Sequence, residues 1–365
     1  MTSPVNIDEI PIPESLTSPG ADDFRAAIAV RNAAGSYVFG QAAATNTPEE
    51  MLPALQEQTY DRKLPLVARK DGQIVGIALL VWSVEPDTRI TWLDAAVHPE
   101  WRTQGIGTAL LDHVEAIAQA SGRPVIQTGG LHKAMETGPR LPSPTGYGTL
   151  PRDEPVVRFL LNRGYTLEQV HRVSFLHLPV DAATLASHRA AAASRAGSDY
   201  RVHTWIGSTP GQWLDDVALV MNRMSTDAPA GNLEIEEEPW DADRVRRNDE
   251  RRIRSGRTSL VAAVEHLPSG RLVAFNGLSV PEDRSRPVDQ GVTLVLKEHR
   301  GHRLGMVVKI ANIEQLQAFN PAAPFIMTGN AEENRPMLDV NEAVGFVPAG
   351  YVGAWKKSFA ETDTP

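Results

Sequence analysis

Hydrophobic and polar residues follow one another along the chain in short runs that predict strands. Residues 64–83 hold two apolar runs around Asp71-Gly72, a dipeptide typical of a tight hairpin turn. Residues 89–97 form a third run, apolar enough to predict a strand inside a sheet. A helical pattern then begins, because Ile106, Leu110 and Val114 recur four residues apart on one face.

The elements after this helix alternate between strands and helices. The helix is predicted to end near Gly122. We then expect a strand at 123–129, a loop rich in Pro and Gly at 138–155, a short helix at 156–164 and a closing strand or hairpin at 165–178.

The same order of elements recurs about 200 residues further along the chain. Two strands are predicted around Ser269-Gly270, and an apolar strand at 288–296 precedes a helix from about Gly305. A strand at 324–330, a helix at 334–345 and a closing segment at 346–359 complete the repeat. This alternation predicts an α/β fold in which each half forms a mixed sheet with helices on both faces.

Residues 181–199 separate the two halves. They are rich in Ala and Ser and hold few bulky side chains, which is typical of a linker that is partly helical. We therefore predict an N-terminal domain at 1–180, a linker at 181–199 and a C-terminal domain at 200–365.

Composition narrows the class of protein. Of the 365 residues, 42% are hydrophobic and 22% charged, as in a soluble globular protein, and no apolar run is long enough to span a membrane. The chain has no cysteine, so disulfides and a cysteine nucleophile are excluded. A net charge of -9 argues against nucleic acid as a partner, and the N-terminus has no signal-peptide pattern, so a cytoplasmic protein is expected. The histidines show no metal-ligand spacing, and we predict no metal site.

The residues at the start of the first helix suggest chemistry. A helix N-terminus presents unpaired N–H groups and a positive dipole end, which together suit a phosphate. Gly105 and Gly107 would let a pyrophosphate approach the backbone, Arg102 adds charge and Thr108 a hydroxyl. Two other interpretations stay open: a turn that only starts a helix, and a dinucleotide fold, although Leu110 stands where the latter has its third glycine.

The pattern around this turn resembles the GCN5-related N-acetyltransferase (GNAT) superfamily. Its signature Arg/Gln-x-x-Gly-x-Gly/Ala is matched by Arg102, Gly105 and Gly107 after the strand that ends at Val97. The second half matches with Arg300 and Gly305, but Arg303 replaces the first glycine. The family's Asn-x-x-Ala…Gly-Phe segment is similar to residues 334–346, which begin at Asn334.

This resemblance implies two GNAT-like domains, each a mixed, mostly antiparallel sheet, and acetyl-CoA as co-substrate. It implies N-acyl transfer to an amine by direct attack, with a small-molecule amine as the expected acceptor and a protein amine as an alternative. The residues expected to hold CoA are Val97, Arg102, Gln104, Gly105, Gly107 and Thr108 in the first half and Val295, Arg300, Arg303, Gly305 and Asn334 in the second. For Arg303 two interpretations stay open: its Cβ crowds the phosphate, or its guanidinium pairs with it.

The catalytic groups are less clearly marked. The family often has an acidic base eleven residues before the arginine, which gives Thr91 in the first half and Asp289 in the second. Asp94 is a second candidate, since it stands among apolar residues of a strand, where a buried carboxylate needs a partner. The usual tyrosine acid is replaced by Leu160 and Asn341. A catalytically degenerate CoA-binding sensor or structural protein therefore remains the alternative function.

Two charged segments receive a prediction of their own. Residues 241–257 hold seven arginines interleaved with acids, which favours a solvated helix with internal ion pairs over a phosphate or RNA site. The acidic residues 231–241 could meet a cationic acceptor, since this region often lines the acceptor site in the superfamily.

Overall fold

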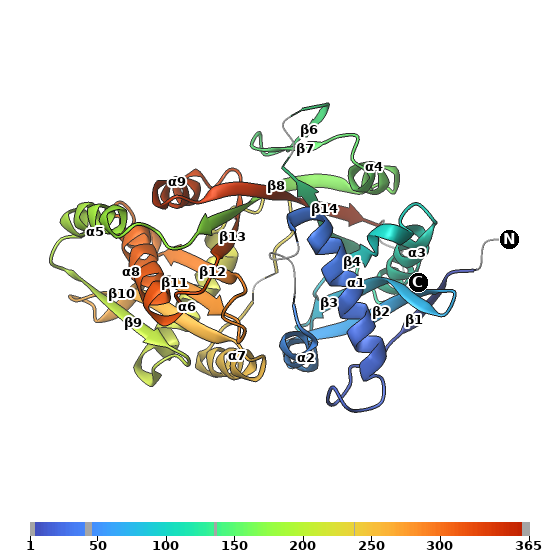
Figure 1. Ribbon diagram of the computed structural model, residues 1–365, viewed down its shortest axis with the longest axis horizontal. Coiled ribbons are helices and arrows are strands. Elements are labelled where there is room, and N and C mark those ends of the chain that lie inside the picture. Colours follow the sequence, from blue (N-terminus) through green and yellow to red (C-terminus); the bar gives the residue numbers. More distant parts are fainter. Residues whose placement is uncertain (1–3, 41–45, 135–136, 237, 360–365) are drawn as a thin grey trace. The chain divides into compact units, whose positions relative to one another are not determined.

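The chain divides into two compact units in a computed structural model that describes residues 4–40, 46–134, 137–236 and 238–359, the side chain of Ser225 apart (Figure 1). The first unit contains Met1–His171, Ala230–Glu236 and Gly350–Pro365. The second contains Arg172–Pro229 and Glu237–Ala349. Two segments from the second half of the sequence therefore belong to the first unit.

This division differs from the predicted boundary at 181–199. Those residues form helix α5 (Ala182–Ala196) in the second unit, with Leu185 and Ala192 buried. The helix begins because the Asp181 side chain accepts a hydrogen bond from the Thr184 N–H, which caps its first turn. The contact boundary lies earlier, inside strand β8 (Thr166–His177), after His171.

The first unit is built on a mostly antiparallel sheet. Its strands, in spatial order, are β1 (Asn6–Glu9), β2 (Asp61–Lys70), β3 (Gln73–Ser83), β4 (Ile90–Val97), β5 (Val125–Lys133) and the C-terminal strand β14 (Val347–Ser358), which joins this unit from Gly350. The hairpin turn at Asp71-Gly72 is confirmed, with φ of 51° and 76°. Among the pairs from β1 to β14, only β4 and β5 run parallel. The part of β8 up to His171 follows β14 in this unit.

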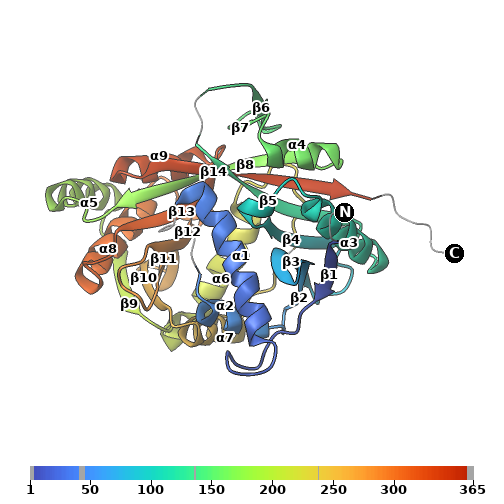
Figure 2. The ribbon, with the colours of Figure 1, turned by 45° about the vertical axis from the view of Figure 1, so that its right-hand side comes forward.

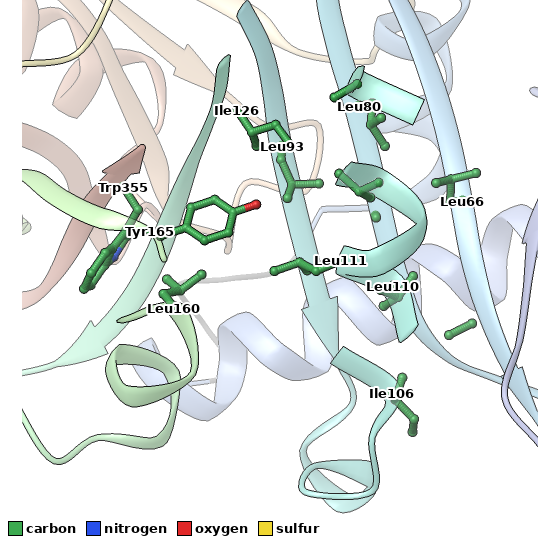
Figure 3. Close-up of a cluster of buried hydrophobic side chains, with 14 of the residues drawn as sticks. Leu66, Leu80, Leu93, Ile106, Leu110, Leu111, Ile126, Leu160, Tyr165 and Trp355 are labelled. Carbon is green, nitrogen blue, oxygen red and sulfur yellow. The ribbon is translucent and has the colours of Figure 1, made fainter. Parts of the chain in front are cut away.

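Helices cover both faces of this sheet, as predicted. Helix α1 (Ala21–Phe39) packs across β3, β4 and β5, beside α2 (Pro48–Gln56) (Figure 2). On the other face, α3 (Ile106–Ala120) and α4 (Pro155–Asn162) bury their apolar residues in one cluster with the strands. Figure 3 shows Leu110, Leu111 and Leu160 of these helices beside Leu93 and Ile126 of the sheet. A short hairpin, β6 (Arg140–Pro142) and β7 (Thr149–Pro151), precedes α4.

The second unit repeats the plan. Its sheet has the order β13 (Phe325–Ala331), β12 (Val288–Val295), β11 (Arg271–Val280), β10 (Thr258–His266) and β9 (Tyr200–Ile206). Helices α6 (Leu214–Asp227) and α7 (Ala242–Arg254) share a core cluster on one face. Helices α5, α8 (Leu304–Phe319) and α9 (Arg335–Val344) contribute buried residues to the opposite side. Helix α7 is the predicted arginine-rich helix, and Arg246–Asp243 is one of its internal ion pairs.

The segment Ala230–Glu236, which follows α6 in the sequence, is fastened to the sheet of the first unit. The Gln127 side chain on β5 exchanges two hydrogen bonds with the backbone of Glu234, at 2.8 and 3.0 Å. The Glu236 carboxylate accepts from the N–H groups of Arg89 and Ile90 at the start of β4, at 2.6 and 3.1 Å. These contacts bury Gln127 completely, so the segment is part of the first unit's structure.

The helices give no sign of a membrane span. Across the described ranges, none of them is both long enough and apolar enough to cross a bilayer.

Candidate functional site

The parallel strands of the first unit separate part-way along their length. β4 and β5 pair from Ile90↔Val125 to Leu93↔Thr128, whereas β4 stays paired with β3 as far as Val97. In the described ladder, the β5-facing edge of residues 94–97 therefore has no strand partner. An edge of this kind can hydrogen-bond an extended, amide-bearing ligand in the manner of an added strand.

A left-handed turn carries the chain from this edge into α3. Thr103 and Gly105 have φ of 61° and 82°, and Gly105 is the N-cap of the helix. No side chain within the described residues caps α3, so its first N–H groups are available to a ligand. A Cβ at Gly105 would meet no atom within 4 Å, so the space beside it is open. Open space, free N–H groups and the positive dipole end together suit an anion.

Polar side chains surround this turn. The Arg102 guanidinium is exposed and lies 4.6 Å from the centroid of the Tyr37 ring. The buried Lys70 amine donates to Gln104 Oε1 at 2.7 Å, which brings a second cation to the turn. The structure thus gathers at one end of β4 the residues predicted for the first half: Val97, Arg102, Gln104, Gly105, Gly107 and Thr108.

The second unit has the same backbone turn, but its glycine stands two residues earlier. Gly301 and Arg303 have φ of 87° and 55°, at the positions of Thr103 and Gly105. Arg303 is the N-cap of α8 in the left-handed conformation that Gly105 adopts at α3. The turn is therefore retained with a Cβ in place, at the cost of a side chain in a region that favours glycine. Gly305 follows in the first turn of α8, and its Cβ position lies 3.7 Å from Val295.

The arginines before the two turns have different surroundings. The Arg300 guanidinium donates to the Asp227 carboxylate at 2.9 Å, and Lys297 contacts the same carboxylate at 3.0 Å. Asp227 has a side chain only 3% exposed, so Arg300 is tied to a buried anion. Among the described residues, Arg102 has no carboxylate partner, and its charge is available to a ligand. The first turn is therefore the better electrostatic match for a phosphate.

Asp94 is not buried, contrary to the prediction. Its side chain is 48% exposed and forms an ion pair with Arg31 of α1 at 2.8 Å. Side chains alternate along a strand, and Leu93 faces the α3 side, so Asp94 faces α1 with Trp92. The apolar neighbours in the sequence lie on the other face or further along the strand, which is why the pattern suggested burial.

Asp289 lies at the start of β12, where the Arg257 guanidinium contacts its carboxylate at 2.5 Å. The count of eleven residues does not match it to Thr91 in the structure. The ladder between β11 and β12 shifts by one residue between Asn276 and Leu278, so β12 contains an extra residue. Thr91 is buried on the α3 face, whereas the Asp289 side chain is 44% exposed. Its role as a base stays a prediction.

Leu160 and Asn341, which replace the tyrosine of the family, are both packed in the interior of their units. Leu160 is 5% exposed within the first unit's core cluster (Figure 3). Asn341 is 1% exposed and donates to Asn330 Oδ1 at 2.7 Å. Asn334, predicted to contact CoA, is the N-cap of α9, and its N–H donates to the Ala331 carbonyl at 2.9 Å.

A histidine–glutamate pair in the first unit has no signature in the sequence. His132 Nδ1 lies 2.6 Å from Glu154 Oε2, and the His132 side chain is fully buried. His132 belongs to the part of β5 beyond its last pair with β4, and Glu154 is the N-cap of α4. In the part of the chain that is described, His132 Nε2 has no hydrogen-bond partner. The two residues come from separate elements, so spacing alone could not reveal them.

Comparison with known proteins agrees with this geometry. A sequence model of the acetyltransferase (GNAT) family matches residues 37–129, which include β4, the turn and α3. The structure superposes on a tandem GNAT protein from the clavulanic acid biosynthesis pathway with a TM-score of 0.77, over 99% of this chain and 100% of that chain, at 22% identity. This chain therefore has the fold of a tandem GNAT protein.

A second structure that matches over the whole chain comes from Sphaerobacter thermophilus. That GCN5-related N-acetyltransferase superposes with a TM-score of 0.60 and 14% identity, over 100% of this chain and 99% of that chain. Curated proteins contain no match to the chain. The GNAT fold agrees with the predicted mixed, mostly antiparallel sheets flanked by helices, and the family model places the glycine turn inside the GNAT domain.

Proposed function

We propose that this tandem GNAT protein is an N-acyltransferase whose first unit transfers an acetyl, or another small acyl, group from acetyl-CoA to an amine. The observation that carries the proposal is the unpaired edge of β4 running directly into the open, uncapped N-terminus of α3. A pantetheine arm is an extended chain with two amides and ends in a pyrophosphate. Its amides would pair with residues 94–97, and its phosphates would meet the α3 N–H groups and Arg102.

The chain's own groups then act by positioning and electrostatics. Acetyl-CoA supplies the activated thioester when it is bound. The edge of β4 orients the thioester beside the gap left by β5, and a free N–H on that edge would stabilise the oxyanion that forms on attack. The amine would approach from the α1 face, where Trp92 and Asp94 are half exposed. A small-molecule amine is the acceptor we favour, and a protein amine is the alternative.

Substitution of Gly107 tests the proposed phosphate site at the N-terminus of α3. Gly107 lies in the first turn of α3, and a Cβ there would come 3.4 Å from the Phe159 ring. Gly107→Asp places a negative charge beside the phosphates, and we expect CoA affinity to fall at least about 10-fold, roughly 1.4 kcal/mol. Gly107→Ala is the matched control, since it adds the Cβ without the charge. Calorimetric titration with CoA measures the affinity of each variant. Equal affinities of wild type and Gly107→Asp would contradict the proposed phosphate site.

A CoA-binding sensor is the second candidate function. The observation that favours it is the absence of a tyrosine at Leu160 and Asn341, both of which are packed into their units. Thiol release from acetyl-CoA across a panel of primary amines separates the two functions. Tight CoA binding with no amine-dependent thiol release would support the sensor, whereas turnover with any of the amines supports the enzyme.

A further inference from the structure

We propose that the second unit binds a small molecule of the amino-acid class, which carries a carboxylate and an amine on an apolar body. The site is a hollow between helix α7 and the sheet, where Arg252 would bind the carboxylate and Asp249 the amine. The hollow lies entirely within the second unit, and binding there does not depend on acyl transfer by the first unit.

The hollow has an outer and an inner part. The outer part is a cavity of about 370 Å³ beside the end of α7 and the start of β10. The inner recess, of about 30 Å³, lies between α6, α7 and the strands β10, β11 and β12. Both parts are lined by Asp249 and Ser259, so they adjoin. The outer volume is typical of a small-molecule pocket, and the recess has room for a group as small as a carboxylate.

Two glycines of the sheet open the inner recess. Gly277 of β11 and Gly291 of β12 both line it. They lie at the bulge, where the ladder between the two strands shifts between Asn276 and Leu278. Among the described residues, a Cβ on Gly291 would meet only the Gly277 carbonyl oxygen, at 3.9 Å. The space over β12 is therefore open to a ligand.

The first unit fills the position that Gly277 leaves open. β3 pairs with β4 from Gly76, and β11 pairs with β12 from Ala274, at the same point of the two sheets. Three residues further along stand Leu79 in the first unit and Gly277 in the second. Leu79 packs against the apolar residues of α1 and α2. The recess thus replaces a packed side chain of the first unit.

Arg252 differs from other arginines in and next to α7. Arg244, Arg246 and Arg257 each contact a carboxylate. Arg252 forms no ion pair with any described residue, and its Nη1 lies 3.5 Å from Ser259 Oγ, at the limit of a hydrogen bond. A guanidinium without a carboxylate at the wall of a hollow can bind a ligand carboxylate through two parallel hydrogen bonds.

The surroundings of Arg252 favour an incoming negative charge. Burial lowers the pKa of the Arg252 guanidinium, and the positive charges of Arg251 and Arg257 act in the same direction. Asp249 opposes them only in part. An arginine side chain nevertheless stays protonated in proteins, so the folded chain bears the cost of a poorly compensated charge. A bound carboxylate would reduce that cost.

Asp249 places a negative charge beside this cation without pairing with it. The two residues are three positions apart on α7, and both line the inner recess. The Thr209 N–H donates to Asp249 Oδ2 at 2.8 Å, which holds the carboxylate in place. A cation and an anion that are neighbours but unpaired match the carboxylate and the ammonium group of one ligand. Apolar side chains that would contact the body of the ligand line the same recess: Met221, Trp240 and Phe275.

The experiment is calorimetric titration of the full chain with L-phenylalanine, L-leucine and L-methionine. Each amino acid is compared with the amine that lacks its carboxylate and with the acid that lacks its amine. We expect at least one of the three amino acids to bind saturably, and about 10-fold or more tightly than either of its analogues. This comparison uses the wild-type chain alone, so it does not depend on the folding of a variant.

Variants assign each charge to its partner. Arg252→Gln should weaken binding of the amino acid about 10-fold and leave the affinity for the corresponding amine unchanged. Asp249→Asn should weaken the amino acid similarly and leave the affinity for the corresponding acid unchanged. Arg254→Gln is the matched control, since Arg254 is exposed on the same helix. Gly291→Leu places a side chain in the recess and should abolish binding, with the fold checked by circular dichroism.

The outcomes separate this site from the proposed acyltransferase. Failure of all three amino acids to bind the wild-type chain would overturn the site, and so would equal affinities of the amino acid for wild type and Arg252→Gln. Titration of the same samples with CoA tests the first unit independently. CoA binding without amino-acid binding would overturn this inference and leave the acyltransferase intact.

Discussion

Replacing Lys309 with methionine should make the second unit more stable, by an amount that depends on pH. The Lys309 side chain is fully buried on α8, and its Nζ donates to Gln290 Oε1 at 2.8 Å. Burial lowers its pKa from 10.5 to about 7. In the first unit the matching position of α3 is Leu111, a buried apolar residue, which indicates that methionine can be accommodated.

Proton linkage gives the sign and the size of the pH dependence of the free energy of unfolding. Between pH 7 and 10.5 the unfolded chain binds a proton at Lys309 and the folded chain does not, so the free energy of unfolding rises with pH. The rise is about 1.4 kcal/mol per pH unit, or roughly 5 kcal/mol over the whole interval. Below pH 7 both states are protonated, and the folded state carries the full cost of a buried charge. The advantage of Lys309→Met should therefore be greatest below pH 7 and shrink by about 4 kcal/mol between pH 7 and 10.

The assay is urea unfolding of wild type and Lys309→Met at pH 6, 7.5, 9 and 10, followed through tryptophan fluorescence. Titration of other groups is common to both proteins and cancels in the difference. Lys309→Arg is an informative companion, because a guanidinium stays charged throughout and should destabilise at every pH. A difference between wild type and Lys309→Met that does not change from pH 6 to 10 would refute the reasoning, since it would mean that Lys309 titrates normally.

Two more substitutions test particular contacts. Arg102→Ala should weaken CoA binding about 10-fold. Arg300→Ala should change CoA binding little, because Arg300 is already paired with Asp227. Equal losses of CoA affinity in calorimetry would show that both turns bind CoA alike. Gln127→Leu should destabilise the first unit by about 1–3 kcal/mol through loss of two hydrogen bonds to Glu234, and amide exchange at Arg89 and Ile90 should quicken; unchanged thermal melting would show that the segment contributes nothing.

The sequence predicts the parts of the fold that are locally encoded. Alternation around Asp71-Gly72 specifies β2 and β3, and the spacing of Leu110 and Val114 specifies α3, since these features depend on neighbours in the chain. Residues 181–199 are harder, because alanine gives no strong apolar stripe. Their helix follows from the Asp181 cap and from Leu185 and Ala192, which pack in the second unit.

The site depends more on contacts between distant residues. Asp94 looks buried in its strand, but Arg31, 63 positions away, holds it at the surface. His132 and Glu154 meet only because α4 begins above β5. The bulge in β12 changes the face on which Asp289 lies, and no count of residues reveals an insertion in a ladder. The turn at the start of α3 could therefore be predicted from the sequence, whereas the surroundings of Asp94, Asp289 and His132 could not.

The first unit can finish folding only late in synthesis, because some of its segments come from late in the chain. Its sheet includes β14 from Gly350 onwards, and its surface includes Ala230–Glu236. A ribosome that has made only the N-terminal half has therefore produced a sheet with β5 still exposed as an edge, which is an aggregation hazard. The unit that holds the intact glycine turn can be completed only when nearly the whole chain has emerged. Cutting the gene at the apparent midpoint would thus yield two fragments, of which the first lacks its last strand.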